Sequence, residues 1–446
     1  MRRLYEDPAY DTARWPQSHW RASLPTPPAR PAAAGSLRAE VAVIGAGYAG
    51  LNAALRLAEA QDTDVVVLEA GQPGWGASGR NGGFCCLGGA HLTDAEIAAR
   101  FGEGGARGFR DFQHRAIEHV AETLVRHAID ARQGPDGEVC LAHSRRALAR
   151  LIAEAEVRRR LYGEGTEIVA PGGLAERGLR GAGFAGAAIL DKGFPIHPLA
   201  YAEGLARAAM ARGVRIFGAS PVVSMTAEGA GWRLATPEAE LRARRVLIAT
   251  NGYSSEDLPP WLGGRTLPVQ SAILMTRPLT AAERQAQGFT TPVMSYDTRN
   301  LLHYFRHLPD GRFLFGMRGG TSARPEAEAK TAARVRREFA RLFPAWAQVE
   351  VEHHWSGFVC MTGSHAPFIG PVPDAPGLYA ALGWHGNGVA PASLGGVLAA
   401  DLIAGVPVAI PAVMRKLPRR FPLPALRRPA LRAAYLWKAM QDGPLP

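Results

Sequence analysis

Lysine is almost missing from this chain: among 446 residues there are only Lys192, Lys330, Lys416 and Lys438. Arginine therefore carries nearly all of the positive charge behind the formal net charge of +11. Basic proteins attract nucleic acids and anionic membranes without specificity. Since alanine is abundant as well, we interpret the charge as a bias of composition. We expect no specific nucleic-acid partner, and we expect a solvated basic tail between Arg415 and Arg432.

Cysteine and long apolar runs are also scarce. The four cysteines have neither the spacing of a zinc site nor that of a disulfide framework: Cys85, Cys86, Cys140 and Cys360. No apolar run reaches the roughly 20 residues of a transmembrane helix, and the first residues lack the apolar stretch of a signal peptide. At 47% hydrophobic and 20% charged residues, the chain is globular and long enough for two domains. These features predict a cytoplasmic protein with no membrane span and no metal site.

What the chain does have is a strand–turn–helix–strand pattern between Glu40 and Glu69. Residues 40–44 (EVAVI) and 65–68 (VVVL) have the composition of buried parallel strands. Between them, residues 45–50 (GAGYAG) form a G-x-G-x-x-G motif that opens a helix. In this context the motif predicts a dinucleotide-binding turn, with the pyrophosphate on the helix N-terminus and the Glu69 carboxylate on the ribose. The predicted cofactor-binding residues of this motif are Gly45, Ala46, Gly47, Tyr48, Ala49, Glu69 and Ala70.

A second glycine-rich stretch, residues 74–83 (GWGASGRNGG), follows the second strand. Such a density of glycine permits close approach of the backbone to a ligand. Arg80 can neutralise a phosphate, and Asn81 can both donate and accept hydrogen bonds. The predicted cofactor contacts of this loop are Gly76, Ala77, Ser78, Arg80, Asn81, Gly82 and Gly83.

The run from Ile44 to Gly83 resembles the FAD-dependent amine and amino-acid oxidoreductases of the D-amino-acid oxidase superfamily. It is most similar to the γ-glutamylputrescine oxidoreductase-like branch, whose members carry a GASGRNGG loop like residues 76–83 of this chain. The resemblance implies an α/β fold. A Rossmann-like FAD-binding domain of the GR2 type is expected to be interleaved with an α+β substrate domain built on an antiparallel sheet.

The same resemblance predicts how the domains divide the chain. An N-terminal arm, 1–38, is expected to lie over the body with Trp15 and Trp20 as anchors, and a C-terminal extension covers 407–446. The FAD-binding domain is predicted to comprise residues 39–92, 145–250 and 350–406. The substrate domain is predicted to comprise residues 93–144 and 251–349.

The resemblance also assigns cofactor contacts to later segments. Relatives contact the adenine through the backbone of the valine that matches Val222, and a segment like residues 249–252 covers the adenosine. Trp355 and Gly357 begin the family pattern W-x-G…P-x-[IV]-G, and residues 386–389 open a helix whose N-terminus can stabilise negative charge. The predicted residues of these three segments are Ala249, Thr250, Asn251, Gly252, Trp355, Gly357, Gly386, Asn387, Gly388 and Val389.

Two further features concern the substrate side. Residues 266–318 have the pattern of an antiparallel sheet, in which His303, Tyr304, Arg306 and Arg318 alternate with apolar residues. Their polar face is either a wall of the substrate pocket or solvated surface. His197, just before a predicted helix, either approaches the flavin or binds local backbone groups.

Three positions depart from the family pattern. Glycine-oxidase-like relatives carry a substrate-binding arginine where this chain has Val359, so a simple α-amino acid would lack its partner there. Sarcosine-oxidase-like relatives carry an oxygen-activating lysine where a rough alignment gives Leu314, which leaves oxidase and dehydrogenase both open. Cys360 lies near the position of their covalent flavin cysteine but out of register with it, so we predict non-covalent FAD.

These observations favour an FAD-dependent amine oxidase or dehydrogenase acting on a polyamine, a γ-glutamylated amine or an N-substituted amine. Hydride transfer to FAD would give an imine that water hydrolyses to an aldehyde. O2 or another molecule accepts the electrons, and the oligomeric state stays open. The candidate catalytic residues are His385, His365 and Tyr304, although each is also simply explained as pocket wall. The alternatives are an FAD-dependent amino-acid oxidase or dehydrogenase of the glycine, D-amino-acid or sarcosine type, an RNA-modifying flavoprotein, and a non-catalytic flavoprotein.

Overall fold

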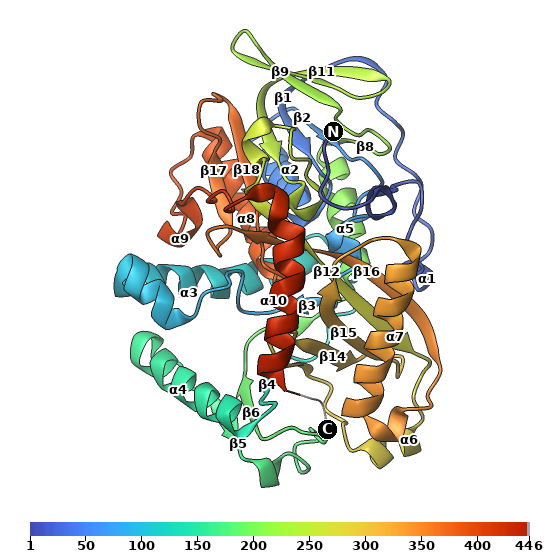
Figure 1. The fold of residues 1–446 in the computed structure, drawn as a ribbon. Helices are drawn as coiled ribbons and strands as arrows, with labels where there is room; N and C mark the ends of the chain where they lie inside the picture. Colours follow the sequence, from blue (N-terminus) through green and yellow to red (C-terminus); the bar gives the residue numbers. More distant parts are fainter. Residues whose placement is uncertain (444–446) are drawn as a thin grey trace.

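The structure, a computed structural model, describes residues 1–443 and is built on two large sheets (Figure 1). The first has the order β17-β18-β11-β1-β2-β8, with β10 and β9 continuing from β11. Its strands from β18 to β8 run parallel, which confirms the predicted Rossmann-like start. Its bounds are β1 Gly35–Ile44, β2 Val65–Leu68, β8 Arg215–Phe217, β9 Ser224–Glu228, β10 Gly231–Ala235, β11 Ala239–Ile248, β17 Phe368–Pro371 and β18 Leu378–Leu382.

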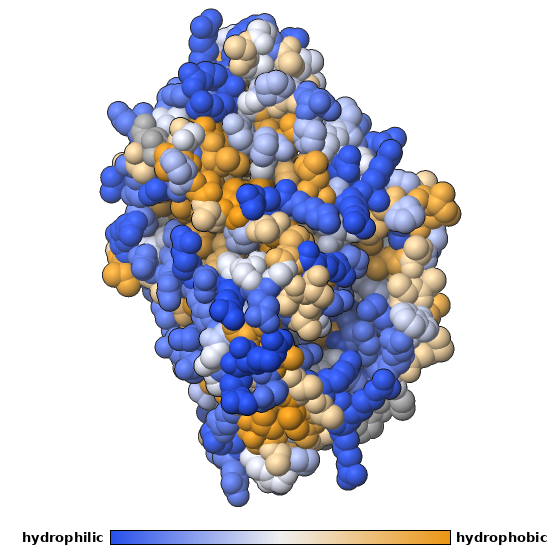
Figure 2. All heavy atoms as spheres, turned by 90° about the vertical axis from the view of Figure 1, so that its left-hand side faces the viewer, coloured by the Kyte–Doolittle hydropathy of each residue, from blue (hydrophilic) through white to orange (hydrophobic). Residues whose placement is uncertain are grey.

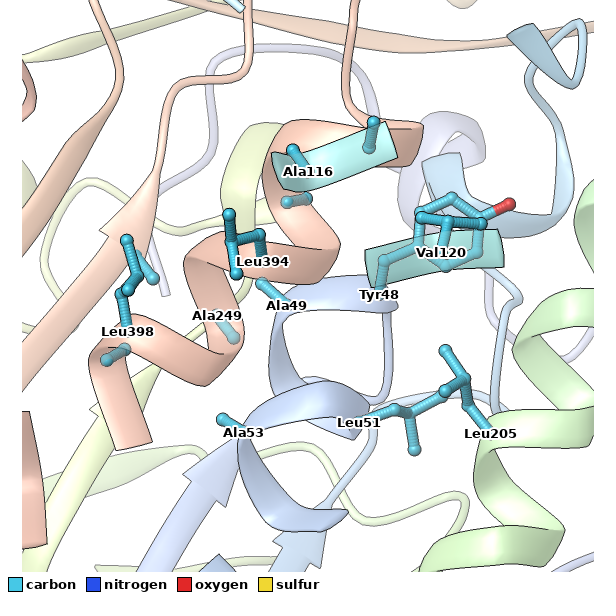
Figure 3. Close-up of a cluster of buried hydrophobic side chains, with 14 of the residues drawn as sticks. Tyr48, Ala49, Leu51, Ala53, Ala116, Val120, Leu205, Ala249, Leu394 and Leu398 are labelled. Atoms are coloured by element: carbon cyan, nitrogen blue, oxygen red, sulfur yellow. The ribbon is translucent and has the colours of Figure 1, made fainter. Parts of the chain in front are cut away.

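Helices α2 Tyr48–Gln61, α5 Pro198–Ala211 and α8 Val389–Ala404 cover one face of the first sheet, and α3 Asp94–Arg126 packs on α8. Figure 3 shows Ala49 and Ala53 of α2 on the side of α8, and Leu51 pointing toward Leu205 of α5. Because both sides of α2 are buried in apolar packing, the N-terminus of α2 has a fixed position at the end of β1.

The second sheet has the order β16-β12-β15-β14-β13-β4-β6-β5 and is antiparallel except between β13 and β4. Its bounds are β4 Glu138–Leu141, β5 Glu167–Val169, β6 Ala187–Leu190, β12 Thr266–Thr276, β13 Met294–Asp297, β14 His303–His307, β15 Phe313–Gly320 and β16 Val351–Thr362. A cluster of buried aromatic side chains packs α7 against this sheet. The remaining elements are α1 His19–Ala22, β3 Phe84–Cys85, α4 Arg145–Tyr162, β7 Phe194–Pro195, α6 Ala281–Gln287, α7 Pro325–Leu342, α9 Ala412–Arg415 and α10 Arg427–Asp442.

The chain crosses between the two sheets at other places than the predicted boundaries. Strands β5 and β6, inside the predicted cofactor range 145–250, pair within the second sheet, and β16, inside 350–406, forms its edge. Helix α3, inside the predicted substrate range 93–144, instead shares the apolar core of α2 and α8. The partner of a short buried strand depends on distant residues, so the strand's own sequence does not determine its sheet.

The N-terminal arm lies against the body of the protein as expected. Trp20 is 1% exposed and donates its indole N–H to the carbonyl oxygen of Asn81 at 2.8 Å. Trp75, in the glycine-rich loop, donates in the same way to the carbonyl oxygen of Arg14 at 2.8 Å. The arm is therefore fastened to the loop that the sequence predicts to hold the cofactor.

The C-terminal segment is not the solvated tail that the charge pattern suggested. In Figure 1, α10 runs along the front of the molecule between the two halves. Arg427 is 5% exposed and pairs with Glu256, while Arg428 pairs with Glu6 at 2.6 Å. At the other end of α10, a carboxylate oxygen of Asp442 accepts hydrogen bonds from Asn300. These basic residues are used to attach α10, and the charge count alone could not show their partners.

No helix within the described residues is long and apolar enough to cross a membrane. Figure 2 shows one face of the molecule, on which hydrophilic side chains separate the hydrophobic ones into patches.

A buried ion pair links β13 and β14 of the second sheet to α7. The imidazole Nδ1 of His303 lies 2.6 Å from Asp297 Oδ2, and its Nε2 lies 3.7 Å from Glu338 Oε2 of α7. Burial alone would lower the pKa of His303, but these two carboxylates raise it to about 9. His303 thus faces α7, on the opposite side of β14 from Tyr304.

We predict a pH-dependent loss of stability on His303→Gln. The pKa of His303 is raised on folding, so its contribution is complete below the unfolded value of 6.5 and is lost as pH rises through about 9. The substitution removes the nearer of the two cations beside the buried Asp297 carboxylate and leaves Arg299 Nε at 3.8 Å, which costs roughly 2 kcal/mol in the free energy of unfolding at low pH. Urea unfolding of both proteins measures the difference, and a difference that stays constant across this range would contradict the ion pair.

Candidate functional site

A cavity of about 390 Å³ lies where the parallel strands of the first sheet end and the second sheet covers them. Ile44, Leu68 and Ile248 close β1, β2 and β11 on one side of it, and Ser271 and Ile273 of β12 line the other. Ligands of open α/β sheets bind at the carboxyl ends of the strands. All predicted cofactor residues line this cavity except Gly83, Gly252 and Trp355.

The first wall is the turn from β1 into α2. Gly45 has φ +107°, a conformation that favours glycine, and a Cβ on Gly50 would collide with the backbone oxygen of Gly45. Gly47 precedes α2 without a side-chain cap, and the N–H of Tyr48 is bound by Ser78 Oγ at 3.0 Å. The remaining N–H groups of the first turn are available to an anionic ligand.

Glu69 lies at the end of β2, beside this turn. Its carboxylate oxygens accept hydrogen bonds from the backbone N–H groups of Ala46 at 2.7 Å and Gly71 at 2.9 Å. Burial raises the pKa of Glu69, and these backbone donors oppose the shift. Each oxygen keeps a further lone pair, so the carboxylate can also accept a ribose hydroxyl, as the sequence predicts.

The second glycine-rich loop is held by its own polar side chains. Arg80 lies 4.1 Å from the centre of the Trp75 ring and donates from Nε to the Trp75 carbonyl oxygen at 2.7 Å. Its Nη2 is buried and has no partner within residues 1–443. Asn81 accepts from the N–H of Gly83 at 2.7 Å and donates to Ala77 and Ser78. The unpaired Nη2 is a donor that a cofactor oxygen would satisfy.

The third wall is the loop before α8. Asn387 donates from Nδ2 to the Leu87 carbonyl oxygen at 2.8 Å, and Gly388 begins α8 without a side-chain cap. Val389 and Ala392, in the first turn of α8, line the cavity. The structure therefore directs the positive ends of two helices, α2 and α8, at one cavity.

The three candidate catalytic residues have different positions. His385 lines the cavity, and its Nε2 lies 3.1 Å from Thr362 Oγ1. Burial lowers the pKa of His385 to about 3, so this ring is neutral at working pH. Tyr304 also lines the cavity, with its hydroxyl 2.8 Å from Ser271 Oγ, and burial raises its pKa to about 12. His365 is not among the lining residues and stacks on His91, which is one of them.

Other polar residues of the second sheet have separate tasks. Arg306 is 3% exposed and donates to the carbonyl oxygens of Gly82 and Ile196, which anchors the glycine-rich loop. His197 caps α5 by accepting from the N–H of Ala200, so its local interpretation is confirmed. Arg318, by contrast, lines the cavity itself. The polar face predicted for this sheet is therefore partly cavity wall and partly support.

Several lining residues were not predicted as cofactor or catalytic residues. Arg3 and Thr12 of the arm reach the cavity, and Thr12 Cβ lies 3.3 Å from where a Cβ on Gly71 would be. Tyr296 of β13 lines it from the second sheet, and His91 and Leu302 line it from connecting segments. Among the lining residues outside those predictions, only Arg318 stood out in the sequence, because it is a charged residue in an otherwise apolar strand.

The chain is similar in sequence to known FAD-dependent oxidoreductases. A sequence model of the family described as "DAO: FAD dependent oxidoreductase" matches residues 40–402. The chain is 31% identical over 435 residues to "Probable oxidoreductase OrdL" of Rhizobium meliloti, covering 95% of this chain and 97% of that protein. It is 30% identical over 372 residues to "Gamma-glutamylputrescine oxidoreductase" of Escherichia coli, covering 83% of this chain and 84% of that protein.

Among solved structures, glycine oxidase from Geobacillus kaustophilus superposes with a TM-score of 0.70 at 23% identity, over 84% of this chain and 96% of that chain. This likeness confirms the fold class. The family match extends over both sheets and over the three cavity walls, which bring together the cofactor residues predicted from the sequence. The chain therefore belongs to the DAO family of FAD-dependent oxidoreductases.

Proposed function

We propose that the protein oxidises the C–N bond of a small amine, giving an imine that water hydrolyses to an aldehyde. The observation that carries this proposal is one cavity that runs from the dinucleotide turn at Gly45 to Tyr304 and Arg318 on the second sheet. A cofactor held by the first sheet and a substrate held beneath the second would meet there. The relatives named above include an enzyme named for an amine substrate.

The residues present fit FAD. The uncapped N-terminus of α2 and Nη2 of Arg80 offer donors to phosphate oxygens, and Glu69 offers an acceptor to a ribose. The uncapped N-terminus of α8 offers a second set of donors at the other end of the cavity. When bound, FAD supplies the acceptor for the hydride that leaves the carbon next to the substrate nitrogen.

The protein's own residues position the substrate and exclude water. Ile273, Leu302 and Trp384 give the cavity apolar walls. His385 is neutral and tied to Thr362, and the Tyr304 hydroxyl is tied to Ser271, so neither is arranged to carry a proton. We assign both as walls and place His365 outside the cavity, as a support for His91. The substrate nitrogen is expected to react in its neutral form, without a dedicated base.

We further propose that O2 is a poor electron acceptor. Leu314, at the position where sarcosine-oxidase-like relatives carry lysine, is fully buried in an apolar cluster with Trp20 and Trp355. No lysine is among the described residues that line the cavity. The cytoplasmic location stays a prediction. The RNA-modifying alternative rests on net charge alone, and part of that charge is engaged in ion pairs at α10.

We predict that an amine will bleach the flavin of the purified protein under anaerobic conditions. The panel contains polyamines, N-methylated amines, γ-glutamylated amines and amino acids, and flavin absorbance is followed after mixing. Reoxidation of the bleached protein by air should be slow, because the buried Leu314 stands where sarcosine-oxidase-like relatives carry their oxygen-activating lysine. If no member of the panel bleaches the flavin, amine oxidation is wrong. If glycine or D-alanine is fastest, the amino-acid alternative holds.

We predict that acid precipitation releases all of the flavin. Cys86 and Cys360 line the cavity, but burial raises the pKa of both thiols, that of Cys360 to about 12. Only a thiolate attacks as a nucleophile, so neither cysteine is set up to form a flavin bond. Flavin fluorescence that stays with the polypeptide on a denaturing gel would contradict non-covalent binding.

We predict that Gly50→Ala lowers both the FAD content and the melting temperature. The added Cβ collides with the backbone oxygen of Gly45, so α2 must move away from the turn, which costs about 1–3 kcal/mol. Gly104→Ala is the matched control, because a Cβ there meets nothing within 4 Å. The flavin-to-protein absorbance ratio and thermal unfolding measure the two effects. Equal FAD content in both variants would contradict the assigned role of the turn.

A further inference from the structure

Arg318 is a cavity-lining arginine without an acidic partner. It lies on β15 beside Ser271 of β12, and its Nη2 donates to the His385 carbonyl oxygen at 3.2 Å. Within residues 1–443 no carboxylate forms an ion pair with it, and the groups that favour its charged form are the hydroxyls of Tyr304 and Tyr435. The Arg318 side chain is half-buried, and burial lowers the pKa of its guanidinium, so the lack of an anion beside it is costly and requires an explanation.

The comparison with Arg306 shows that Arg318 is not a structural anchor of the same kind. Arg306, on the neighbouring strand β14, donates from Nε and Nη2 to two carbonyl oxygens and joins the loop at Gly82 to the segment before α5. Within residues 1–443 Arg318 makes a single hydrogen bond, and none of its nitrogen atoms is both shielded from solvent and without a partner. Its remaining donors are therefore open to the cavity that it lines.

The guanidinium of Arg318 also lies near Val359, the residue that departs from the family pattern. A Cβ built on Gly386 would lie 2.9 Å from Nη2 of Arg318 and 3.5 Å from Cγ1 of Val359. Both side chains thus end beside the same backbone position, although Val359 comes from β16 and Arg318 from β15, on either side of β12. Position 359 carries no positive charge, but Arg318, on another strand, places a positive charge beside the same backbone position.

We propose that Arg318 binds a carboxylate of the substrate, so that the substrates are amines that also carry an acid group. This inference rests on the proposed amine oxidation. The planar guanidinium offers two parallel N–H donors to a carboxylate, and the low dielectric of the cavity strengthens the contact. The acid group is either attached to the reacting carbon, as in an amino acid, or sits at the far end of the molecule, as in a γ-glutamylated amine.

Binding of a carboxylate that cannot be oxidised tests Arg318 apart from turnover. Acetate and benzoate are titrated into the holoenzyme, and the shift of the flavin absorbance gives their Kd. Loss of a charge-assisted contact in Arg318→Met should raise Kd about 10- to 100-fold. Arg318→Lys keeps the charge without the fork and should give a smaller rise. Exposed Arg337 on α7 provides the control, since Arg337→Gln removes one positive charge at a residue that does not line the cavity.

A relocation experiment provides the sharpest test. In the double variant Arg318→Met/Val359→Arg, the new side chain starts beside the same point near Gly386, so it should restore carboxylate binding toward the wild-type Kd. Restoration shows that a cation at this place, and not the shape of Arg318, is what the ligand needs. An unchanged Kd in Arg318→Met at normal FAD content would overturn the proposal. A wild-type Kd in Arg318→Gln, which has no positive charge, would overturn it as well.

Substrate pairs distinguish the two sources of the acid group. Glycine is compared with methylamine, and γ-glutamylputrescine with N-acetylputrescine, by anaerobic bleaching of the wild type and of Arg318→Met. In Arg318→Met, the preference for the acid-bearing member of one pair should be lost. The pair in which it is lost identifies the source of the acid group. A wild type that prefers methylamine and N-acetylputrescine overturns the proposal. Carboxylate binding through Arg318 without any amine bleaching would refute the proposed oxidation and leave the anion site standing.

Discussion

The contact between α2 and the end of β1 is the constraint on which the rest of the structure depends. At Gly45 and Gly50 the backbone of the turn and the first turn of α2 lie too close for any side chain. This closeness directs the N-terminus of α2 into the cavity, while apolar packing on both sides prevents α2 from sliding. The same turn donates hydrogen bonds from its backbone N–H groups to Ser78 Oγ and to the Glu69 carboxylate. A cofactor site of this kind depends on backbone geometry more than on any single charged side chain.

The second sheet and the loops beside it determine the electrostatics of the site. Burial keeps His91 and His385, which lie in loops, neutral and keeps Tyr304 of β14 protonated, so these groups line the cavity without adding charge. His303 is charged, but it faces α7 and is compensated by Asp297. Arg318 is thus the lining cation nearest to the third wall, in an environment where one charge has a large effect on what binds.

Local signals in the sequence predicted the parts of the site that are built from contiguous backbone. The turn at Gly45, the loop at Arg80 and the start of α8 each require glycine at fixed spacing, and such spacing is visible without a structure. Non-local pairings carried no such signal. The sheet membership of β5 and β6, the packing of α3 on α8, and the meeting of Arg318 with Val359 depend on residues far apart in the chain. His365 shows the converse error, since a histidine in a motif need not face the ligand.

The two terminal segments are joined to each other. Glu6 of the arm accepts from Arg428 of α10 and from the backbone N–H of Ala323, while Arg3 and Thr12 of the same arm form part of the cavity wall. Both segments lie beyond the residues that the family pattern covers. Groups that share one ion-pair network do not contribute independently to stability. A substitution that disrupts α10 would therefore also disturb, through Glu6, the arm residues that form part of the cavity wall, although α10 lies hundreds of positions further along the chain.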